Sequence, residues 1–159
     1  MLVAEELSNR LELIDADNAK IFSAQFEAFS VRWKQAINQW NEDAKLLRGR
    51  SIVVHHKSFS YLINWLNMRQ VASIEPKPGI PPSISDLKAL LSKLKKDGAD
   101  AIIRTLYDPK DPSDWVSQKT GIPVLSLPYT VGGDTDSQDI FSLFDRSIFL
   151  LKKAVSVHK

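Results

Sequence analysis

Residues 51–61 read SIVVHHKSFSY, and this stretch decides the fold. A short β-branched run, Ile52–Val54, ends abruptly at two histidines, and a helix-compatible segment begins at Phe59. β-branched residues favour strands, so the stretch is typical of a strand, a loop and a helix in succession. In a parallel α/β sheet, ligands bind at the carboxyl ends of the strands, and His55 and His56 are expected at such an end.

Two of the three histidines of the chain lie in this stretch, and the third, His158, is expected to be disordered beside the C-terminus. Imidazole is the commonest side-chain ligand of zinc in proteins. The chain has no cysteine, so disulfides and thiolate metal sites are excluded. A metal site in this chain therefore has to use His, Asp, Glu or backbone oxygen.

Length and composition indicate an ordinary globular protein. The chain has 159 residues, which suits one domain with an appendage, and its net charge of +2 is too small to indicate nucleic-acid binding. No apolar run reaches the ~18 residues that span a bilayer. The N-terminal sequence MLVAEELSNRLELID lacks the basic region and apolar core of a signal peptide, so a leader, if the natural protein is exported, is missing from this chain.

The first 50 residues are expected to form a helical segment, and residues 51–159 an α/β lobe. Asp15 or Asp17 is suited to cap a helix. Six large apolar side chains then recur at intervals of three and four residues: Phe22, Phe26, Phe29, Trp33, Ile37 and Trp40. This spacing predicts a continuous amphipathic helix over Asn18–Leu47, with its aromatic stripe buried against the domain or a second copy.

After Arg50 the sequence alternates between strand-like and helix-like segments. The expected strands are Ile52–Val54, Val71–Ile74, Ala101–Ile103 and Val124–Leu127. Ser83 with Asp86 resembles a capping box, and Asp111 with Pro112 is expected to cap and open a later helix. Four successive βα units predict an α/β fold: a four-stranded parallel sheet of order 2-1-3-4 with helices on both faces, in three αβα layers.

Together these segments resemble the C-terminal half of the zinc/manganese-type solute-binding proteins of bacterial ABC transporters. The resemblance rests on VHHKSFSY (54–61), EPKPGIPPS (75–83), TGIPV (120–124), LPYTVGG (127–133) and DIFSLFD (139–145), with residues 15–50 as the linking helix. In this family one long helix joins two α/β lobes. A metal ion lies between the lobes, usually held by three histidines and one carboxylate.

The resemblance makes His56 the metal-ligand candidate and implies Asp139 and Asp134 as candidates for the carboxylate. His55 alternates with His56 along the strand, so its side chain is expected to point the opposite way. Glu75 follows the second strand and is expected at the same sheet edge. There it would orient the imidazole of His56 through its second nitrogen.

Two departures from the family pattern affect the expected site. The first lobe, which should supply two histidines, is absent from this chain. The usual family Asp before Pro is replaced by Leu127 before Pro128. Asp139 also suits the first turn of a helix without any metal, and a bond to the loop backbone is the alternative for Glu75.

The resemblance implies a non-enzymatic lobe that binds zinc, or else manganese, in a periplasmic or cell-surface protein feeding an ABC permease. The implied partners are the permease, the missing N-terminal lobe and a second copy through the aromatic helix, with no nucleic acid. The residues alone leave two alternatives open. One is a small metal-dependent hydrolase, which needs a general base and an open metal position. The other is a structural oligomerisation module built on the aromatic helix.

Overall fold

The computed structural model describes residues 1–77 and 79–156. His158 therefore lies outside the described residues, as does Pro78 in the proline-rich loop. The chain divides into two compact units, Met1–Glu42 and Asp43–Lys159.

The first unit is helical throughout. Helix α1 (Leu2–Ile14) ends at Asp15, whose carboxylate accepts a hydrogen bond from the backbone N–H of Asn18 at 3.3 Å. Asp15, rather than Asp17, therefore caps the short 3₁₀ turn η1 (Ala16–Asn18) that leads into the next helix. Helix α2 follows over Ala19–Asp43, and no proline or glycine interrupts it.

The predicted helix over Asn18–Leu47 is confirmed from Ala19 to Asp43, and wrong in its last turn. Ala44–Leu47 form a 3₁₀ turn, η2, which belongs to the second unit. Leu47 is fully buried, and Arg48 after it has an extended backbone. The tighter i→i+3 turn satisfies the last carbonyls where the chain leaves the helix for the sheet.

The N-terminal part of the aromatic stripe of α2 lies beside α1 within the first unit. Phe26, Phe29 and Trp33 are half-buried, and Trp40 is buried. The rings of Phe29 and Trp33 stack at a centroid distance of 5.7 Å, and Trp33 meets Trp40 edge-to-face at 5.2 Å. A hollow of about 180 Å³ lies between α1 and α2, lined by Ala4, Leu7, Ser8, Leu11, Phe22, Gln25, Phe26 and Phe29. Helix α1 thus provides part of the cover that was expected from the domain or a second copy.

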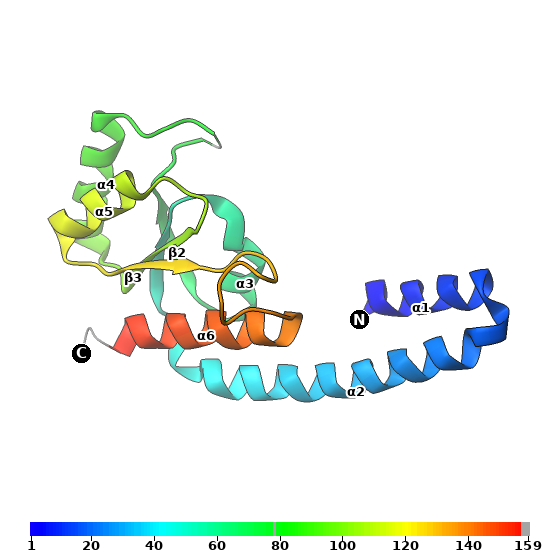
Figure 1. The fold of residues 1–159 in the computed structure, drawn as a ribbon. Helices are drawn as coiled ribbons and strands as arrows, with labels where there is room; N and C mark the ends of the chain where they lie inside the picture. The colour runs from blue at the N-terminus through cyan, green and yellow to red at the C-terminus, as the bar shows by residue number, and fades with distance from the viewer. Residues whose placement is uncertain (78, 157–159) are drawn as a thin grey trace. The chain divides into compact units, whose positions relative to one another are not determined.

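The second unit alternates strands and helices (Figure 1). Its strands are β1 (Ser51–Val54), β2 (Arg69–Ser73), β3 (Ala101–Thr105) and β4 (Val124–Leu127). Its helices are α3 (Ser60–Trp65, after the 3₁₀ turn η3 at Lys57–Phe59), α4 (Ile84–Asp97), α5 (Lys110–Thr120) and α6 (Ile140–Ser156). In the part of the chain that the structure describes, no helix has both the length and the apolarity to cross a membrane.

The four strands form one parallel sheet of order β2-β1-β3-β4, so the predicted fold class and strand order are confirmed. Helices α4 and α5 lie on one face of the sheet and α6 on the other (Figure 1). Under α4 and α5, Val53 and Ile102 of the sheet belong to one core cluster with Leu90, Leu94 and Val116. Burial of this apolar surface is the main force that holds the layers together.

The starts of two helices test the capping signals in the sequence. The capping box is confirmed: Ser83 Oγ accepts from the backbone N–H of Asp86, whose carboxylate accepts from that of Ser83. The expected cap at Asp111 is wrong, because α5 already begins at Lys110 and Pro112 lies inside its first turn. N–H groups of the first turn have no acceptor within the helix, so a proline there interrupts nothing.

Candidate metal site at the carboxyl edge of the sheet

The strand order creates a topological switch point between β1 and β3. From β1 the chain crosses to β2 on one side and later returns to β3 on the other. In open α/β sheets, ligands bind in the crevice outside the carboxyl ends of the strands at such a point. The segments after the four strands bring His55, His56, Glu75, Asp108 and Tyr129 to this edge.

His56 and Glu75 meet at this edge. Nδ1 of His56 lies 2.7 Å from Oε2 of Glu75. Because a carboxylate only accepts, Nδ1 is the donor in this contact, and Nε2 is the ring nitrogen that Glu75 does not contact. A carboxylate on the second nitrogen is the usual way in which a protein orients a metal-binding imidazole. The two side chains keep 35% and 16% of their surface exposed, so solvent reaches the pair.

His55 lies in a different environment from His56. It is 1% exposed, and its Nδ1 has no hydrogen-bond partner among the residues that the structure describes. Burial lowers the pKa of His55 below its ordinary value, and the nearby carboxylates of Asp108 and Glu75 offset only part of that effect. The ring is therefore neutral at pH 7 and belongs to the interior of the unit.

Asp134 is engaged by Arg146 of α6. Nε of Arg146 donates to Oδ2 of Asp134 at 2.9 Å, and its Nη1 lies 3.1 Å from Oδ2 of Asp136. Burial raises the pKa of Asp134, but the hydrogen bonds from Ser137, Arg146 and the backbone of Asp136 outweigh it. The pKa of Asp134 therefore lies below its ordinary value. The charge of Asp134 is stabilised without any metal ion.

Asp139 opens helix α6. Its Oδ1 accepts from the backbone N–H of Ser142 at 2.7 Å and from Oγ of the same residue at 2.9 Å. Such a carboxylate satisfies an unpaired N–H group and is favoured by the helix dipole. Within residues 1–77 and 79–156, no group of three or more His, Asp or Glu side chains is arranged to hold a metal. The structure thus brings His56 to Glu75, and does not gather His56, Asp134 and Asp139 into one ligand set.

Two glycines shape the loop between β4 and α6. Gly132 has a φ of +74°, which side chains rarely allow, and its N–H donates to Ser137 O at 2.6 Å. Gly133 is needed for space, because a Cβ there would lie 2.8 Å from the backbone oxygen of Thr130 and 3.2 Å from Cβ of Pro128. The loop therefore follows a path that the sequence permits only through this pair of glycines.

Gly133→Ala is expected to destabilise the protein by about 1–3 kcal/mol, the usual cost of forcing a methyl group into occupied space. The added Cβ has to displace backbone atoms of Thr130 rather than a flexible side chain end. Urea unfolding followed by circular dichroism measures the change. Thr135→Ala, at an exposed position of the same loop, is the matched control and should stay within about 0.5 kcal/mol of the parent. Equal stability of the two variants would contradict this account of Gly133.

Arg146→Met is expected to reduce stability at pH 7 by about 1 kcal/mol, since the pair with Asp134 is only partly buried. Because the pKa of Asp134 is lowered on folding, the ionised Asp134 stabilises the folded state fully above the unfolded pKa of about 4. It is lost as the pH falls through the lower folded pKa. The difference in unfolding free energy between the parent and Arg146→Met, measured by urea titration, should therefore be smaller at pH 3 than at pH 7. Lys88→Met, at an exposed position of α4, is the control, and an equal difference at both pH values contradicts the prediction.

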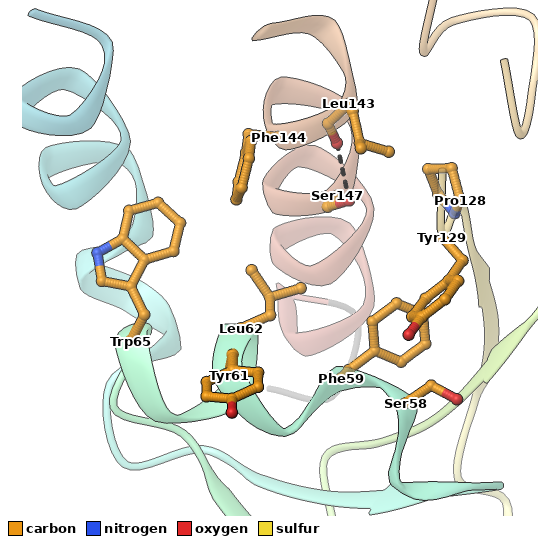
Figure 2. A pocket seen from close by; sticks show the side chains of 10 residues that line it. All are labelled: Ser58, Phe59, Tyr61, Leu62, Trp65, Pro128, Tyr129, Leu143, Phe144 and Ser147. Atoms are coloured by element: carbon orange, nitrogen blue, oxygen red, sulfur yellow. Dashed lines mark hydrogen bonds between the residues drawn. The ribbon is translucent and has the colours of Figure 1, made fainter. Parts of the chain in front are cut away.

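An apolar trough opens at the same edge of the sheet, and the sequence analysis did not predict it. Its volume is about 360 Å³, and its walls come from η3, α3, the segment after β4, and α6 (Figure 2). The lining side chains are Ser58, Phe59, Tyr61, Leu62, Trp65, Pro128, Tyr129, Leu143, Phe144 and Ser147. The spacing of Tyr61, Leu62 and Trp65 on one short helix was the available signal, but the opposite wall lies about eighty residues further along the chain.

Comparison with known proteins agrees with this fold. Residues 1–154 match the family model described as zinc-uptake complex component A, periplasmic, or ZnuA. Three solved structures are similar. ZnuA has 22% identity and a TM-score of 0.70, with 95% of this chain and 54% of that chain covered. FpvC from Pseudomonas aeruginosa in complex with Mn²⁺ has 19% identity and a TM-score of 0.72, covering 96% and 58%. A Zn(II)-bound variant of AdcAII from Streptococcus pneumoniae has 17% identity and a TM-score of 0.69, covering 95% and 56%.

These matches differ in what they establish. No curated protein matches the chain. The solved structures are below 25% identity and show the fold, and this chain spans little more than half of their length. The family model covers nearly the whole chain, so the resemblance identified from the sequence is confirmed. The chain belongs to the family of the periplasmic component A of the zinc-uptake complex, a family of metal-binding solute-binding proteins.

Proposed function

We propose that the chain contributes the metal-binding lobe of a periplasmic solute-binding protein that delivers zinc to an ABC permease. Residues 51–159 form this lobe in the proposal, and residues 1–50 form the helical segment that links it to another lobe. The observation that carries the proposal is the pair of His56 and Glu75 at the switch point of the sheet. The pair presents an imidazole that a carboxylate orients, and imidazole nitrogen is a favoured zinc ligand.

Ligand chemistry favours zinc over manganese for this lobe. Imidazole nitrogen suits zinc, whereas manganese prefers carboxylate and water oxygens, so more carboxylates at the site would shift the preference. The family supports both ions, since ZnuA is a zinc-uptake component and FpvC has been solved with Mn²⁺. The task of the protein is capture and release of the ion, without catalysis.

The ligand set on this lobe is incomplete in the proposal. Zinc in proteins is usually held by four ligands in a tetrahedron. Asp134 would have to leave Arg146, and Asp139 would have to leave Ser142, before either could bind an ion beside His56. A second lobe would supply the remaining ligands, and the solved relatives have the extra length for one.

Zinc titration calorimetry tests the proposal, with this chain alone compared with a fusion that restores a first lobe ahead of residue 1. We expect the fusion to bind one zinc ion at least about a hundredfold more tightly than the chain alone, since several ligands are then added. Tight, stoichiometric binding by the chain alone would contradict the shared site, and no binding by either protein would overturn the proposed function. The gene is also expected beside a permease and an ATPase gene.

A further inference from the structure

We infer that the edge of the sheet at which the strands begin is a second interaction surface, which docks on an anionic lipid membrane. This surface is separate from His56 and Glu75, so the inference does not rest on the metal site. It consists of exposed cations from the segment before β1, the start of β2 and the last turns of α4, α5 and α6. These six residues, the basic surface, are Arg48, Arg69, Lys95, Lys96, Lys119 and Lys153.

The parallel topology gathers these side chains at one edge. A helix that joins two parallel strands runs back to where the strands begin, so the last turns of α4 and α5 lie at that edge. Arg69 of β2 and Lys93 of α4 accordingly line one hollow of about 330 Å³. The last turn of α6 reaches the same edge, since α6 packs against η2, which leads into β1. Helix dipoles favour lysines at helix ends, but Arg69 lies in a strand, outside that rule.

The carboxylates at this edge pair with other cations. Three pairs account for them among the described residues of the second unit: Asp97 with Lys93 at 2.8 Å, Asp100 with Arg50 at 3.0 Å, and Asp43 with Lys152 at 3.7 Å. Arg69 donates to the uncharged hydroxyl of Ser51 at 2.6 Å. The six charges of the basic surface are therefore in excess at this edge, although the whole chain has a net charge of only +2.

The opposite edge of the sheet has the reverse balance of charge. Carboxylates outnumber Lys and Arg side chains in the segments that follow the strands and open the helices, and Glu75, Asp108 and Asp136 are examples. Charges of opposite sign at the two ends orient the lobe in an external field, so an anionic surface attracts the basic end and repels the other. The lobe then docks with the edge that carries His56 facing away from the membrane.

An exposed leucine favours a lipid membrane over other anionic partners. Leu46 of η2 is 58% exposed, and its backbone oxygen accepts a hydrogen bond from Nε of Arg50 at 3.4 Å, so it lies at the same edge as the basic surface. Lipid headgroups offer phosphates to the cations and, just below them, an apolar layer to the leucine. A nucleic-acid duplex presents phosphates at its surface and gives Leu46 no comparable apolar layer.

Co-sedimentation of the full chain with lipid vesicles tests the inference. Vesicles of phosphatidylcholine and phosphatidylglycerol in equal parts carry negative charge, whereas vesicles of phosphatidylcholine alone carry none. We expect the chain to sediment with the charged vesicles at low ionic strength and to stay in solution with the neutral ones. Binding should fall as salt is added, because the Debye length shrinks from about 10 Å at 0.1 M to about 3 Å at 1 M.

Two triple variants separate the basic surface from the net charge of the chain. Both remove three exposed lysines, one set from the basic surface and the other from around the opposite edge of the sheet. The first should weaken vesicle binding at least about tenfold, and the second, the matched control, by less than about twofold. Leu46→Gln should weaken it about threefold without any change of charge. The two triple variants are Lys95→Gln with Lys96→Gln and Lys119→Gln, and Lys57→Gln with Lys77→Gln and Lys110→Gln.

Several outcomes would overturn the inference. Equal effects of the two triple variants mean that net charge alone binds the vesicles. Equal sedimentation with charged and neutral vesicles, or none with either, excludes docking on anionic lipid. Tighter binding to duplex DNA than to charged vesicles at the same salt, with no effect of Leu46→Gln on either, identifies a nucleic acid as the partner instead. All these measurements are made without zinc, so their result and that of the zinc titration are independent of each other.

Discussion

His56→Ala in the two-lobe protein is expected to weaken zinc binding at least tenfold, which corresponds to about 1.4 kcal/mol. The change removes the imidazole donor and leaves the carboxylate of Glu75 without its partner at 2.7 Å. His55→Ala should have a much smaller effect on zinc binding, because the side chain of His55 is buried in the interior of the unit. Competition calorimetry at pH 7 measures the two affinities.

Glu75 provides a second check on the same site. Loss of a carboxylate that orients a metal-binding histidine typically reduces affinity about 10–100-fold, so Glu75→Ala should weaken zinc binding while His56 remains in place. Glu75→Gln keeps an acceptor at the same position and should have a smaller effect than Glu75→Ala. If His55→Ala proves more damaging than His56→Ala, or if neither matters, the assignment of His56 as the ligand is wrong.

Arg104→Ala should cause the largest loss of stability, about 3 kcal/mol, without any contact to the candidate metal site. Arg104 lies within β3 and is 9% exposed. Its guanidinium donates to the hydroxyls of Ser126 at 3.0 Å and Ser113 at 2.7 Å, and to the carboxylate of Asp114 at 2.7 Å. Breaking a buried charged network by removing one partner costs about 3–5 kcal/mol. We expect the lower end of this range because the side chain of Asp114 is exposed to water.

Urea unfolding of Arg104→Ala and of a surface control measures this effect. Lys93→Ala removes an exposed pair with Asp97 on α4, and such pairs contribute about 0.3–0.5 kcal/mol. A loss below about 1 kcal/mol for Arg104→Ala would show that water takes the place of the guanidinium and satisfies its former partners. That result would contradict the burial of Arg104 in the structure.

Most of the fold could be predicted from the sequence because several local signals agree. The β-branched run Ile52–Val54, the box formed by Ser83 and Asp86, and the regular alternation of strands and helices all indicate one parallel sheet. The start of β2 was placed too late, since Arg69 and Gln70 are exposed and polar. They lie in an edge strand, which pairs on one side only and can therefore carry polar residues.

The candidate site was harder to predict than the fold. The approach of Glu75 to His56 follows from the ends of two parallel strands, which meet at one edge whatever the loops do. The partner of Asp134 depends instead on the path of a loop, and that path depends on contacts at Gly133 that no sequence pattern reports. The trough is likewise a product of tertiary packing between distant segments.

The central position of β1 has a consequence for how the chain folds during synthesis. Ser51 pairs with Arg69, 18 residues later, whereas Ile52 pairs with Ala101, 49 residues later. The hydrophobic strand β1 can thus pair with β2 early, whereas pairing with β3 has to follow later in synthesis. Contacts between residues that are distant in sequence also form slowly. Until β3 has left the ribosome, one edge of β1 stays open to other chains. A product that stops before Ala101 lacks every residue of β3 that pairs with β1, and we expect it to aggregate rather than fold.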